Sequence, residues 1–535
     1  MKNKSYFILL LALAAAPAVA QGTLDSEEVD VIRDYNPILA DAVKVGITGL
    51  IPDNDTETAP LTYNVPLTFY TMPYQPIRIK PVALTKSPKE ELTKNYLRAG
   101  FGTQFTPLGE LYLNSAQSDK FQYGLAARYT SAKSNRENQQ YSDLDIDGRG
   151  KFFFDKAFVM PINAWFRNDV VHYYGYDEPL TFENDSVRQR FSNYGLSFAF
   201  ANLKKNDAEI DYSLGAGFRG ISSLDGYRQM NPYIDLIADK RLKNDHKVGA
   251  GLNIDYYNFN GPLPFETVFT TLSLRYGIVQ PGWSLQASID NTIGFDSKYF
   301  PIPRVDFSKD LIGDKLVFIA GVDGQLHRNN FASLTGLNPF LADSFVIKPT
   351  SDYQFYGGIR ASTADNLSFS AKGYYSNFID QVFFINNPTD TLRFKTVYGS
   401  GSRAGVNVEL GYFIADVVEV AAVLNAFTFN ELSGVEEAWH TPTLEWQLST
   451  AYQLNSKLKL GAQVFGLGKS LALMPDSDIR EIKGTVDINL NATYAFRERF
   501  DIFLDINNIA GIQYERYYNY PSYGFNLLGG ISFSF

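Results

Sequence analysis

The chain has no cysteine in its 535 residues, and this absence excludes several kinds of chemistry. A structural disulfide, a thiolate metal site and a lipid anchor on an N-terminal cysteine all require the missing thiol. Histidine is scarce as well: only His172, His246, His327 and His440 occur, and no local motif pairs one of them with a nucleophile. We therefore predict that the protein is not an enzyme and that it uses no cofactor and no metal.

Long hydrophobic runs are missing beyond the first twenty residues. Residues 1–20 carry two lysines, an apolar run and a small-residue ending, which is typical of a secretory signal peptide cleaved after Ala20. The most apolar later stretch, residues 414–427, contains two acidic residues. No stretch reaches the roughly 18 apolar residues of a membrane-spanning helix. An exported chain of this kind is either soluble or crosses a membrane as strands.

Positively charged residues are outnumbered by negatively charged ones. The chain has 48 Lys and Arg residues against 58 Asp and Glu residues, which gives a net charge of −10. Removal of the two lysines in the signal peptide lowers this value by two, to −12. Nucleic acid requires a basic surface, so we expect no nucleic-acid partner.

The most informative positive feature is a strict alternation of apolar and polar residues. In residues 485–496, Val486, Ile488 and Leu490 share one face of an extended strand, and Asp487 and Asn489 share the other. Similar runs occupy residues 212–218, 247–256, 283–289, 367–375, 444–454 and 500–506. Strands of soluble sandwiches usually have about 5–6 residues, whereas tilted membrane strands need about 9–11. Most of these runs approach or reach the membrane length.

The polar faces of these runs favour a barrel with a wet interior. The sequence also supplies 41 Phe and 34 Tyr residues for the aromatic girdles of such a barrel. We predict an all-β fold: a transmembrane antiparallel β-barrel of about 16–22 strands over residues 95–535, with the upper end of that range favoured. The polar residues Asp487, Asn489, Asp501 and Asp505 are expected to face inward.

The connections between strands alternate in length. Short turns at residues 204–207, 243–245 and 455–456 are expected in the periplasm, and longer loops are expected outside the cell, as in other membrane barrels. The long loops are predicted at residues 174–190, 328–352, 431–442, 469–481 and 507–524. The last of them carries Tyr514, Tyr517, Tyr518 and Tyr520. These tyrosines are either an external loop that contacts a sugar or a protein, or part of an aromatic belt at the membrane boundary.

One acidic segment is similar to the start of a metal-binding loop. Residues 143–148 place three aspartates at alternate positions before a glycine, as at the start of an EF-hand loop. The twelfth position of that loop would be Phe154 instead of glutamate. A row of carboxylates on one face of a strand is the favoured interpretation.

The C-terminal residues 530–535 alternate and end on an aromatic ring. Ile531, Phe533 and Phe535 share one face, with serines on the other. This pattern resembles the signal that the barrel-assembly machinery reads in Gram-negative outer-membrane proteins. The resemblance implies location in the outer membrane, with that machinery and outer-membrane lipid as partners.

The first part of the exported chain, residues 21–94, is different in kind. It holds eight prolines and no sustained alternation. Proline at this density prevents pairing in central strands. We expect an irregular segment outside the barrel wall, in the lumen or in the periplasm.

The sequence of residues 500–535, with Tyr514, Tyr520 and Gly524 before the closing strand, resembles the end of TonB-dependent receptor barrels. Residues 338–339 and the strands after them are similar to the middle of those barrels. Glu28, Val29, Val31 and Ile32 belong to a segment that is faintly similar to a TonB box. The resemblance implies uptake of a solute across the outer membrane, with TonB as a possible partner.

Residues 21–94 depart from that family, because they are about half the length of its plug domain. In this respect the chain looks like the plugless, receptor-like barrels of Bacteroidota. Three hypotheses therefore stay open. The protein takes part in solute uptake, or it is a non-transporting scaffold or accessory subunit of an outer-membrane assembly or secretion complex, or it is a passive porin.

Overall fold

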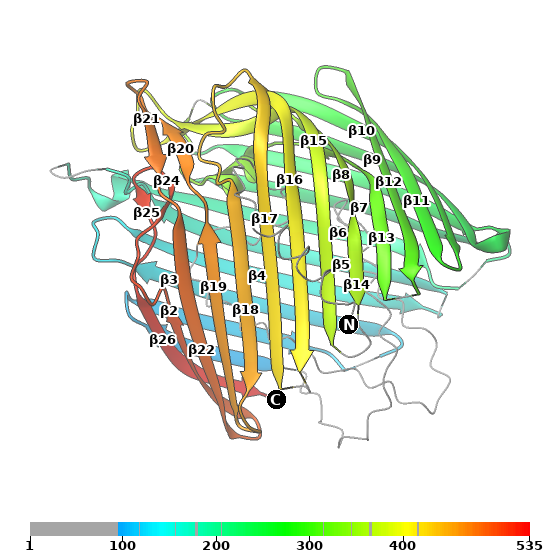
Figure 1. Cartoon of the computed structure of the whole chain (residues 1–535), viewed down its shortest axis with the longest axis horizontal. Helices are drawn as coiled ribbons and strands as arrows, with labels where there is room; N and C mark the ends of the chain where they lie inside the picture. Colours follow the sequence, from blue (N-terminus) through cyan, green and yellow to red (C-terminus); the bar gives the residue numbers. More distant parts are fainter. Residues whose placement is uncertain are drawn as a thin grey trace, which may run out of the picture.

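The computed structural model describes residues 95–535 except 117, 156, 177–179, 205, 314, 344, 363–365 and 415–416. The expected signal peptide, the proline-rich segment and the TonB-box-like residues Glu28, Val29, Val31 and Ile32 lie outside the described residues. Within the described part, 22 strands form one closed antiparallel barrel (Figure 1). This number is the upper limit of the predicted range.

Each strand of the barrel pairs with its neighbours in chain order. The strands are β1 (Tyr96–Gly102), β2 (Thr106–Asn114), β3 (Phe121–Lys133), β4 (Gln140–Phe154), β5 (Phe158–His172), β6 (Arg188–Asn202), β7 (Ile210–Ser223), β8 (Arg228–Arg241), β9 (His246–Asn260), β10 (Phe265–Gln280), β11 (Trp283–Gly294), β12 (Lys298–Ile312), β13 (Leu316–His327), β14 (Thr350–Ser362), β15 (Leu367–Asn386), β16 (Phe394–Ile414), β17 (Val418–Ser433), β18 (Leu444–Gln453), β19 (Leu458–Leu467), β22 (Thr485–Arg497), β23 (Phe500–Asn507) and β26 (Asn526–Ser534).

Short elements occupy the connections. Two small hairpins lie in the last two long loops, and one short α-helix lies between β13 and β14. These elements are β20 (Ser470–Leu473), β21 (Ile479–Ile482), β24 (Glu515–Tyr517), β25 (Tyr520–Pro521), α3 (Phe331–Leu337) and the 3-10 turns η1 (Asn184–Ser186) and η2 (Lys243–Asp245). No helix in the described residues has the length and apolar character needed to cross a membrane.

The barrel closes where the first strand meets the last. β1 pairs with β26 in antiparallel register, from Tyr96 opposite Ser534 to Gly102 opposite Leu528. Glycine is required at this seam, because a Cβ atom on Gly530 would lie 2.2 Å from the carbonyl oxygen of Ala99. Closure leaves the 22-stranded sheet without an unpaired edge.

The two faces of the wall differ as the alternation predicts. On β22, Val486 is 45% exposed on the outer face, and Asp487 is completely buried on the inner face. Asn489 and Asp505 are also buried, and Asp501 is half-buried. The inward orientation expected for these polar residues is confirmed. An apolar outer face and a polar inner face are the arrangement that a membrane barrel needs.

The acidic segment at residues 143–148 is part of a strand. It lies within β4, where Asp145 is 3.5 Å from the guanidinium of Arg167 on β5. The favoured interpretation as a carboxylate row is confirmed, because a strand cannot wrap its side chains around one ion. The described residues contain no group of three or more His, Cys, Asp or Glu residues that is arranged to hold a metal ion.

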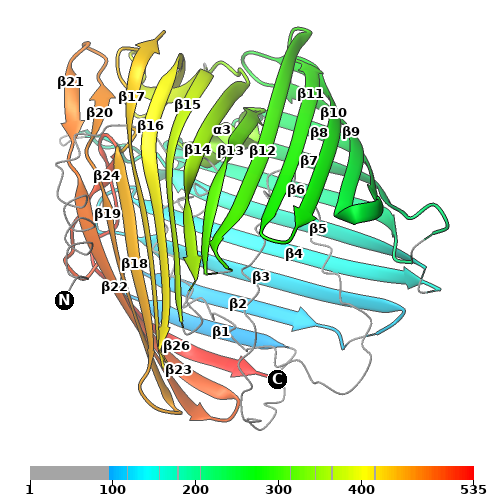
Figure 2. The ribbon, with the colours of Figure 1, turned by 45° about the vertical axis from the view of Figure 1, so that its right-hand side comes forward.

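The short turns and the long loops predicted from the sequence lie at opposite ends of the barrel. The short turns after β6, β8 and β18 lie at one end, together with Asn95 and Phe535, whose backbones are hydrogen bonded at 2.9 Å. All five predicted long loops lie at the other end, which we call the mouth. The predicted connections therefore alternate as expected, but the short connections of residues 103–105, 224–227, 261–264 and 295–297 also lie at the mouth, so the alternation does not hold around the whole ring. Figure 2 shows α3 inside the ring of strands, near the mouth.

Candidate functional site at the mouth of the barrel

The wall is tallest on one side of the mouth. β15 has 20 residues and β16 has 21. A tilted strand crosses a membrane in about 9–11 residues, so these two strands extend well beyond a membrane. They form a support for the loops that gather at the mouth.

The loop of residues 328–349 folds into the barrel. It begins with α3, whose first turn is closed by a reciprocal pair of hydrogen bonds. The Asn330 side chain accepts from the Ser333 backbone N–H at 3.0 Å, and the Ser333 hydroxyl accepts from the Asn330 N–H at 2.8 Å. This capping box fixes the start of a helix too short to be stable alone.

Apolar side chains of this loop meet the barrel wall in one buried cluster, which we call the mouth cluster. Its buried members are Val171, Tyr174, Phe191, Ile221, Phe259, Phe331, Leu334, Leu341, Phe345, Val382, Phe384, Phe394, Tyr517 and Tyr520. Ile221 lies on β7 and Phe394 on β16, nine strands apart in a ring of 22 where the largest possible separation is eleven. The mouth cluster therefore connects nearly opposite walls of the barrel.

The tyrosines of the last long loop join this cluster. The Tyr517 hydroxyl donates to the carbonyl oxygen of Leu337 at 2.7 Å, and the Tyr520 ring stacks on Phe340 with 3.8 Å between ring centroids. Tyr514 is buried as well. These three rings are therefore buried within the chain.

Tyr518 is the exception among the four tyrosines. It is partly exposed, and its hydroxyl accepts a hydrogen bond of 2.6 Å from Arg480 on β21. That these four tyrosines form an external contact loop stays a prediction, and Tyr518 is the most accessible of them.

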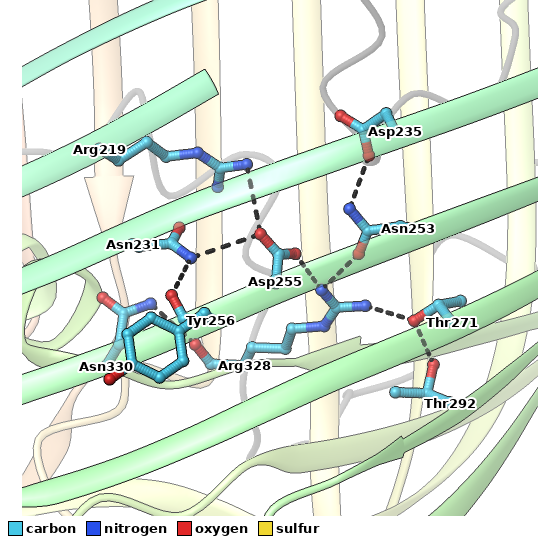
Figure 3. Close-up of polar contacts among 10 residues, drawn as sticks. All are labelled: Arg219, Asn231, Asp235, Asn253, Asp255, Tyr256, Thr271, Thr292, Arg328 and Asn330. Atoms are coloured by element: carbon cyan, nitrogen blue, oxygen red, sulfur yellow. Dashed lines mark hydrogen bonds and ion pairs between the residues drawn. The ribbon is translucent and has the colours of Figure 1, made fainter. Parts of the chain in front are cut away.

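Polar contacts fasten the start of the loop to the inner wall (Figure 3). The Arg328 guanidinium pairs with the Asp255 carboxylate on β9. It also donates to the Asn253 side-chain oxygen at 2.9 Å and to the Thr271 hydroxyl at 2.6 Å. A second guanidinium, from Arg219 on β7, lies 4.0 Å from the same carboxylate. The Asp255 carboxylate thus faces two guanidinium groups, that of Arg219 from the wall and that of Arg328 from the loop.

Neighbouring amides orient these groups. The Asn231 side chain donates to Asp255 at 3.4 Å. The Gln229 side chain accepts from the backbone N–H of Phe331 at 2.7 Å and donates to Asn330 at 3.3 Å. The inner wall of β8 and β9 therefore holds the first turn of α3 as well as Arg328.

Removal of one partner from a buried ion pair lowers the stability of a protein far more than replacement of both partners by apolar residues. The carboxylate of Asp255 is almost fully buried and the side chain of Arg328 is 17% exposed. The loss of one partner typically costs about 3–5 kcal/mol, because the other charge stays desolvated. Arg328 is therefore a strong determinant of where the loop lies.

The loop is fastened again near its end. Leu341 and Phe394 form an isolated parallel bridge, in which the Ala342 N–H donates to the Phe394 carbonyl oxygen at 2.8 Å. The Arg393 guanidinium donates to the Asp343 carboxylate at 2.7 Å. These contacts attach the loop to the start of β16, across the lumen from Asp255.

One histidine is buried at the mouth. The Nδ1 atom of His440 lies 2.8 Å from the carbonyl oxygen of Phe384. Burial lowers the pKa of His440 to about 4, although the hydrogen bond to Phe384 opposes this shift. The ring is therefore neutral near pH 7.

The C-terminal residues lie at the seam. Ile531 is exposed on the outer face of β26, and the Phe533 ring stacks on Phe500 with 4.5 Å between centroids. Phe535 stacks on Phe533 in turn, at 5.2 Å. Recognition of these three residues by an assembly machinery stays a prediction.

Sequence reasoning placed residues 328–352 outside the cell and did not identify Arg328, Asp255 or His440. A local signal was present in the apolar residues Phe331 and Leu334, which are unusual in a loop expected to face water. The partners of Arg328, Asp255 and His440, however, are distant in sequence. No spacing rule connects them.

No family model and no curated protein matches this sequence. Solved structures do match. They include the siderophore receptor PirA from Acinetobacter baumannii, with a TM-score of 0.65, 10% identity, and coverage of 84% of this chain and 81% of that one. The FrpB iron transporter from Neisseria meningitidis (F3-3 variant) has a TM-score of 0.65, 10% identity and coverage of 83% and 82%.

The ferric-catecholate import receptor Fiu from E. coli K12 matches with a TM-score of 0.64, 12% identity, and coverage of 84% of this chain and 83% of that one. Identities this low show likeness of fold. The barrel expected from the resemblance to TonB-dependent receptors is thereby confirmed. The chain has the fold of the siderophore-receptor barrels.

Proposed function

We propose that this protein is an outer-membrane barrel that takes part in uptake of a solute, and that the loop of residues 328–349 gates its lumen. The observation that carries the proposal is the pairing of Arg328 with Asp255, which holds an apolar cluster across a polar-walled barrel. A polar wall suits passage of a hydrated solute, and a packed mouth suits controlled passage. The fold shared with siderophore receptors supports the same function.

The proposed location is the outer membrane, with lipid around the barrel. The signal-peptide pattern of residues 1–20 and the terminal Ile531, Phe533 and Phe535 support export and insertion by the barrel-assembly machinery. The apolar outer face supports contact with hydrocarbon.

Planar-bilayer conductance tests the gate. We would compare the mature protein, a version that lacks residues 21–94, and Arg328→Gln in each of these backgrounds. Low conductance in the mature protein, with large openings after Arg328→Gln, is the expected result. Large stable conductance in the unaltered protein would support a passive porin. Absence of measurable conductance in all four proteins would exclude a lumen that opens.

The packed mouth also favours the second hypothesis, a non-transporting scaffold or accessory subunit. A barrel whose mouth is spanned by 14 buried side chains has no need to open if it only holds partners. Silence in all four conductance measurements, together with co-purification of other outer-membrane proteins at fixed stoichiometry, would establish this alternative.

TonB is a proposed partner through Glu28, Val29, Val31 and Ile32. A TonB-box-like segment binds by adding a strand, so proline at Val29 and Val31 removes the backbone donors that pairing uses. A pull-down with TonB that is lost in the double proline variant would support energised uptake. Equal capture of both proteins would exclude this segment as the contact.

A further inference from the structure

A groove on the outer face of the barrel takes no part in the packing of the mouth. It crosses β18, β19, β22 and β23, which are neighbours in the wall (Figure 2). The groove has a volume of about 300 Å³, which is at the lower end of the range for small-molecule sites. The residues that line it include Tyr452, Leu460, Ala462, Leu490, Ala492 and Leu504.

The position of the groove on the outer face follows from the strand register. Leu490 and Ala492 follow Val486 at even spacing on β22, so they share its outer face. Ala492 lies opposite Leu460 on β19 and opposite Leu504 on β23. Residues that lie opposite each other on neighbouring strands share a face of the sheet. These side chains therefore point away from the lumen.

Small side chains leave the groove between larger ones. On β19 and β22, Ala462 lies opposite Leu490, and Leu460 lies opposite Ala492. Leu490 is 40% exposed and stands clear of the two alanines. A gap beside a methyl group loses dispersion contacts when nothing fills it. Because the lining is largely apolar, a hydrocarbon chain is the occupant that fits it.

Aromatic rings show where the groove lies relative to the membrane boundary. Tyr494 and Phe496 on β22 and Phe500 on β23 are exposed on the wall, near the end opposite the mouth. Exposed rings in this position are typical of the aromatic girdle of a membrane barrel. Ala492 is two residues closer to the mouth than Tyr494. The groove therefore lies on the hydrocarbon side of these rings.

Three cations lie at the same end, beyond the aromatic rings. Lys457, Arg497 and Arg499 are exposed at two turns. The turns are neighbours, because the Ala495 N–H, two residues before Arg497, donates to the Lys457 carbonyl oxygen at 2.7 Å. Glu498 is the only acidic residue in residues 454–457 and 497–499, so three positive charges and one negative charge give a net charge of +2. Basic residues beside a membrane surface attract anionic lipid headgroups.

The groove and the cations are separated by less than the depth of one leaflet. Ala492 is five residues from Arg497, which is about 17 Å along a strand that rises about 3.3 Å per residue. A strand tilt of about 35–45° shortens this distance to roughly 12–14 Å along the membrane normal. One leaflet supplies about half of a hydrocarbon core of about 30 Å. A phosphate at the cations therefore places its acyl chain at the groove.

A second protein fits this face less well than a lipid. Ten residues line the groove, whereas a stable protein interface has about 20–30 residues on each side. The size of the groove thus favours one chain of a lipid over a second copy of the barrel.

We propose that this face of the barrel binds one anionic phospholipid, with an acyl chain in the groove and its phosphate on Lys457, Arg497 and Arg499. The net charge of +2 favours a lipid of net negative charge over a zwitterionic lipid, whose second headgroup charge is positive. The inference rests on the proposed location in the outer membrane and is independent of whether the lumen opens.

Phosphatidylglycerol is the probe that tests the site, and phosphatidylcholine with the same acyl chains is its zwitterionic counterpart. Each lipid is titrated into the mature protein in detergent, and native mass spectrometry counts the lipids bound to each barrel. We expect one phosphatidylglycerol to bind with saturation. Phosphatidylcholine should bind at least fivefold more weakly.

Substitutions separate this site from general contact with lipid. Ala492→Leu fills the groove and should weaken phosphatidylglycerol binding at least fivefold. Ala250→Leu is the matched control, because Ala250 is exposed on the outer face of β9, opposite Leu274, and does not line the groove. The control should bind the lipid as the unaltered protein does.

A second pair of variants tests the headgroup contact. Arg497→Gln combined with Arg499→Gln should weaken phosphatidylglycerol binding several-fold and should bring it close to that of phosphatidylcholine. Lys243→Gln is the control, because Lys243 lies in the turn η2 at the same end of the barrel but between β8 and β9. It should leave binding unchanged.

Each variant is first checked for heat-dependent gel mobility, so that only folded barrels are compared. Absence of saturable binding, equal binding by Ala492→Leu and Ala250→Leu, or equal binding of the two lipids by the unaltered protein would overturn the proposal. Dimers that Ala492→Leu disrupts would identify a second barrel as the occupant and would overturn it as well. Lipid binding is measured without transport, so its failure would leave the conductance results standing, and absent conductance would leave the lipid site standing.

Discussion

The carboxylate of Asp255 on β9 pairs with the guanidinium of Arg328, which is 73 residues later in the chain and is the first residue of the loop of residues 328–349. This contact joins the barrel wall to the loop at the mouth. Arg219 shares the same carboxylate at 4.0 Å, so the wall already carries a cation that can hold Asp255 when the loop leaves. Arg328 can therefore leave Asp255 while the carboxylate keeps the positive charge of Arg219 nearby.

Arg328→Gln should loosen the loop while the barrel stays intact. Loss of one member of a buried pair costs about 3 kcal/mol at the lower end of the usual range, which corresponds to roughly a hundredfold rise in the open population. Cleavage by chymotrypsin within residues 328–349 should accelerate accordingly.

Arg275→Gln is the matched control for that measurement. Arg275 also pairs with an inner-wall carboxylate, Asp239 at 3.0 Å, and its described hydrogen-bond partners lie on the wall. Its variant should be cleaved at the rate of the unaltered protein. If both variants were cleaved equally fast, the effect would come from the wall in general.

Acidification should loosen the mouth around His440. The folded pKa of about 4 lies below the ordinary 6.5, so the unfolded loop binds a proton more readily than the packed one. The stabilisation is complete above pH 6.5 and falls as the pH drops from 6.5 to 4, by about 3 kcal/mol in total. Hydrogen exchange of residues 434–443, corrected for intrinsic rates, should rise across this range.

A His440→Gln variant should lose that pH dependence, and His246→Gln should retain it. His246 lies near the opposite end of the barrel, where its Nδ1 is 2.8 Å from the Tyr276 hydroxyl. Retention of the full pH dependence in His440→Gln would assign it to another group.

Gly530→Ala should impair closure of the barrel. Its new methyl group would lie 2.2 Å from the Ala99 carbonyl oxygen and 2.4 Å from the Phe503 ring. Gly109→Ala on β2 is the control, because nothing lies within 4 Å of a Cβ atom at that position. The fraction of protein with heat-dependent gel mobility should fall severalfold in Gly530→Ala only. Equal fractions would show that the seam tolerates a side chain.

The barrel itself was predictable because its signal is local. Alternation along residues 485–496 is enough to place Val486 outside and Asp487 inside, whatever the neighbouring strand is. The long connections then mark one end of the barrel, although short connections occur at both ends. The number of strands could be predicted only as a range, because the sequence of a long hairpin can be divided into strands in more than one way.

The mouth was not predictable in the same way, because its contacts are long-range. Tyr517 and Tyr520 have the composition of an external aromatic loop, and only the position of α3 shows that they pack inward. Arg328 is one of many charged residues near strand ends, and its partner Asp255 is recognisable only once β9 and the loop are placed side by side.

A reversible lock on the loop tests the central claim most directly. The chain lacks cysteine, so Leu341→Cys and Phe394→Cys, at the bridged positions, would introduce the only thiols. We would record single-channel conductance of this pair with Arg328→Gln, in the version that lacks residues 21–94. The account predicts a closed barrel when the disulfide is formed and large openings after reduction. If the conductance were the same before and after reduction, whether low or high, the claim that the loop gates the lumen would be contradicted.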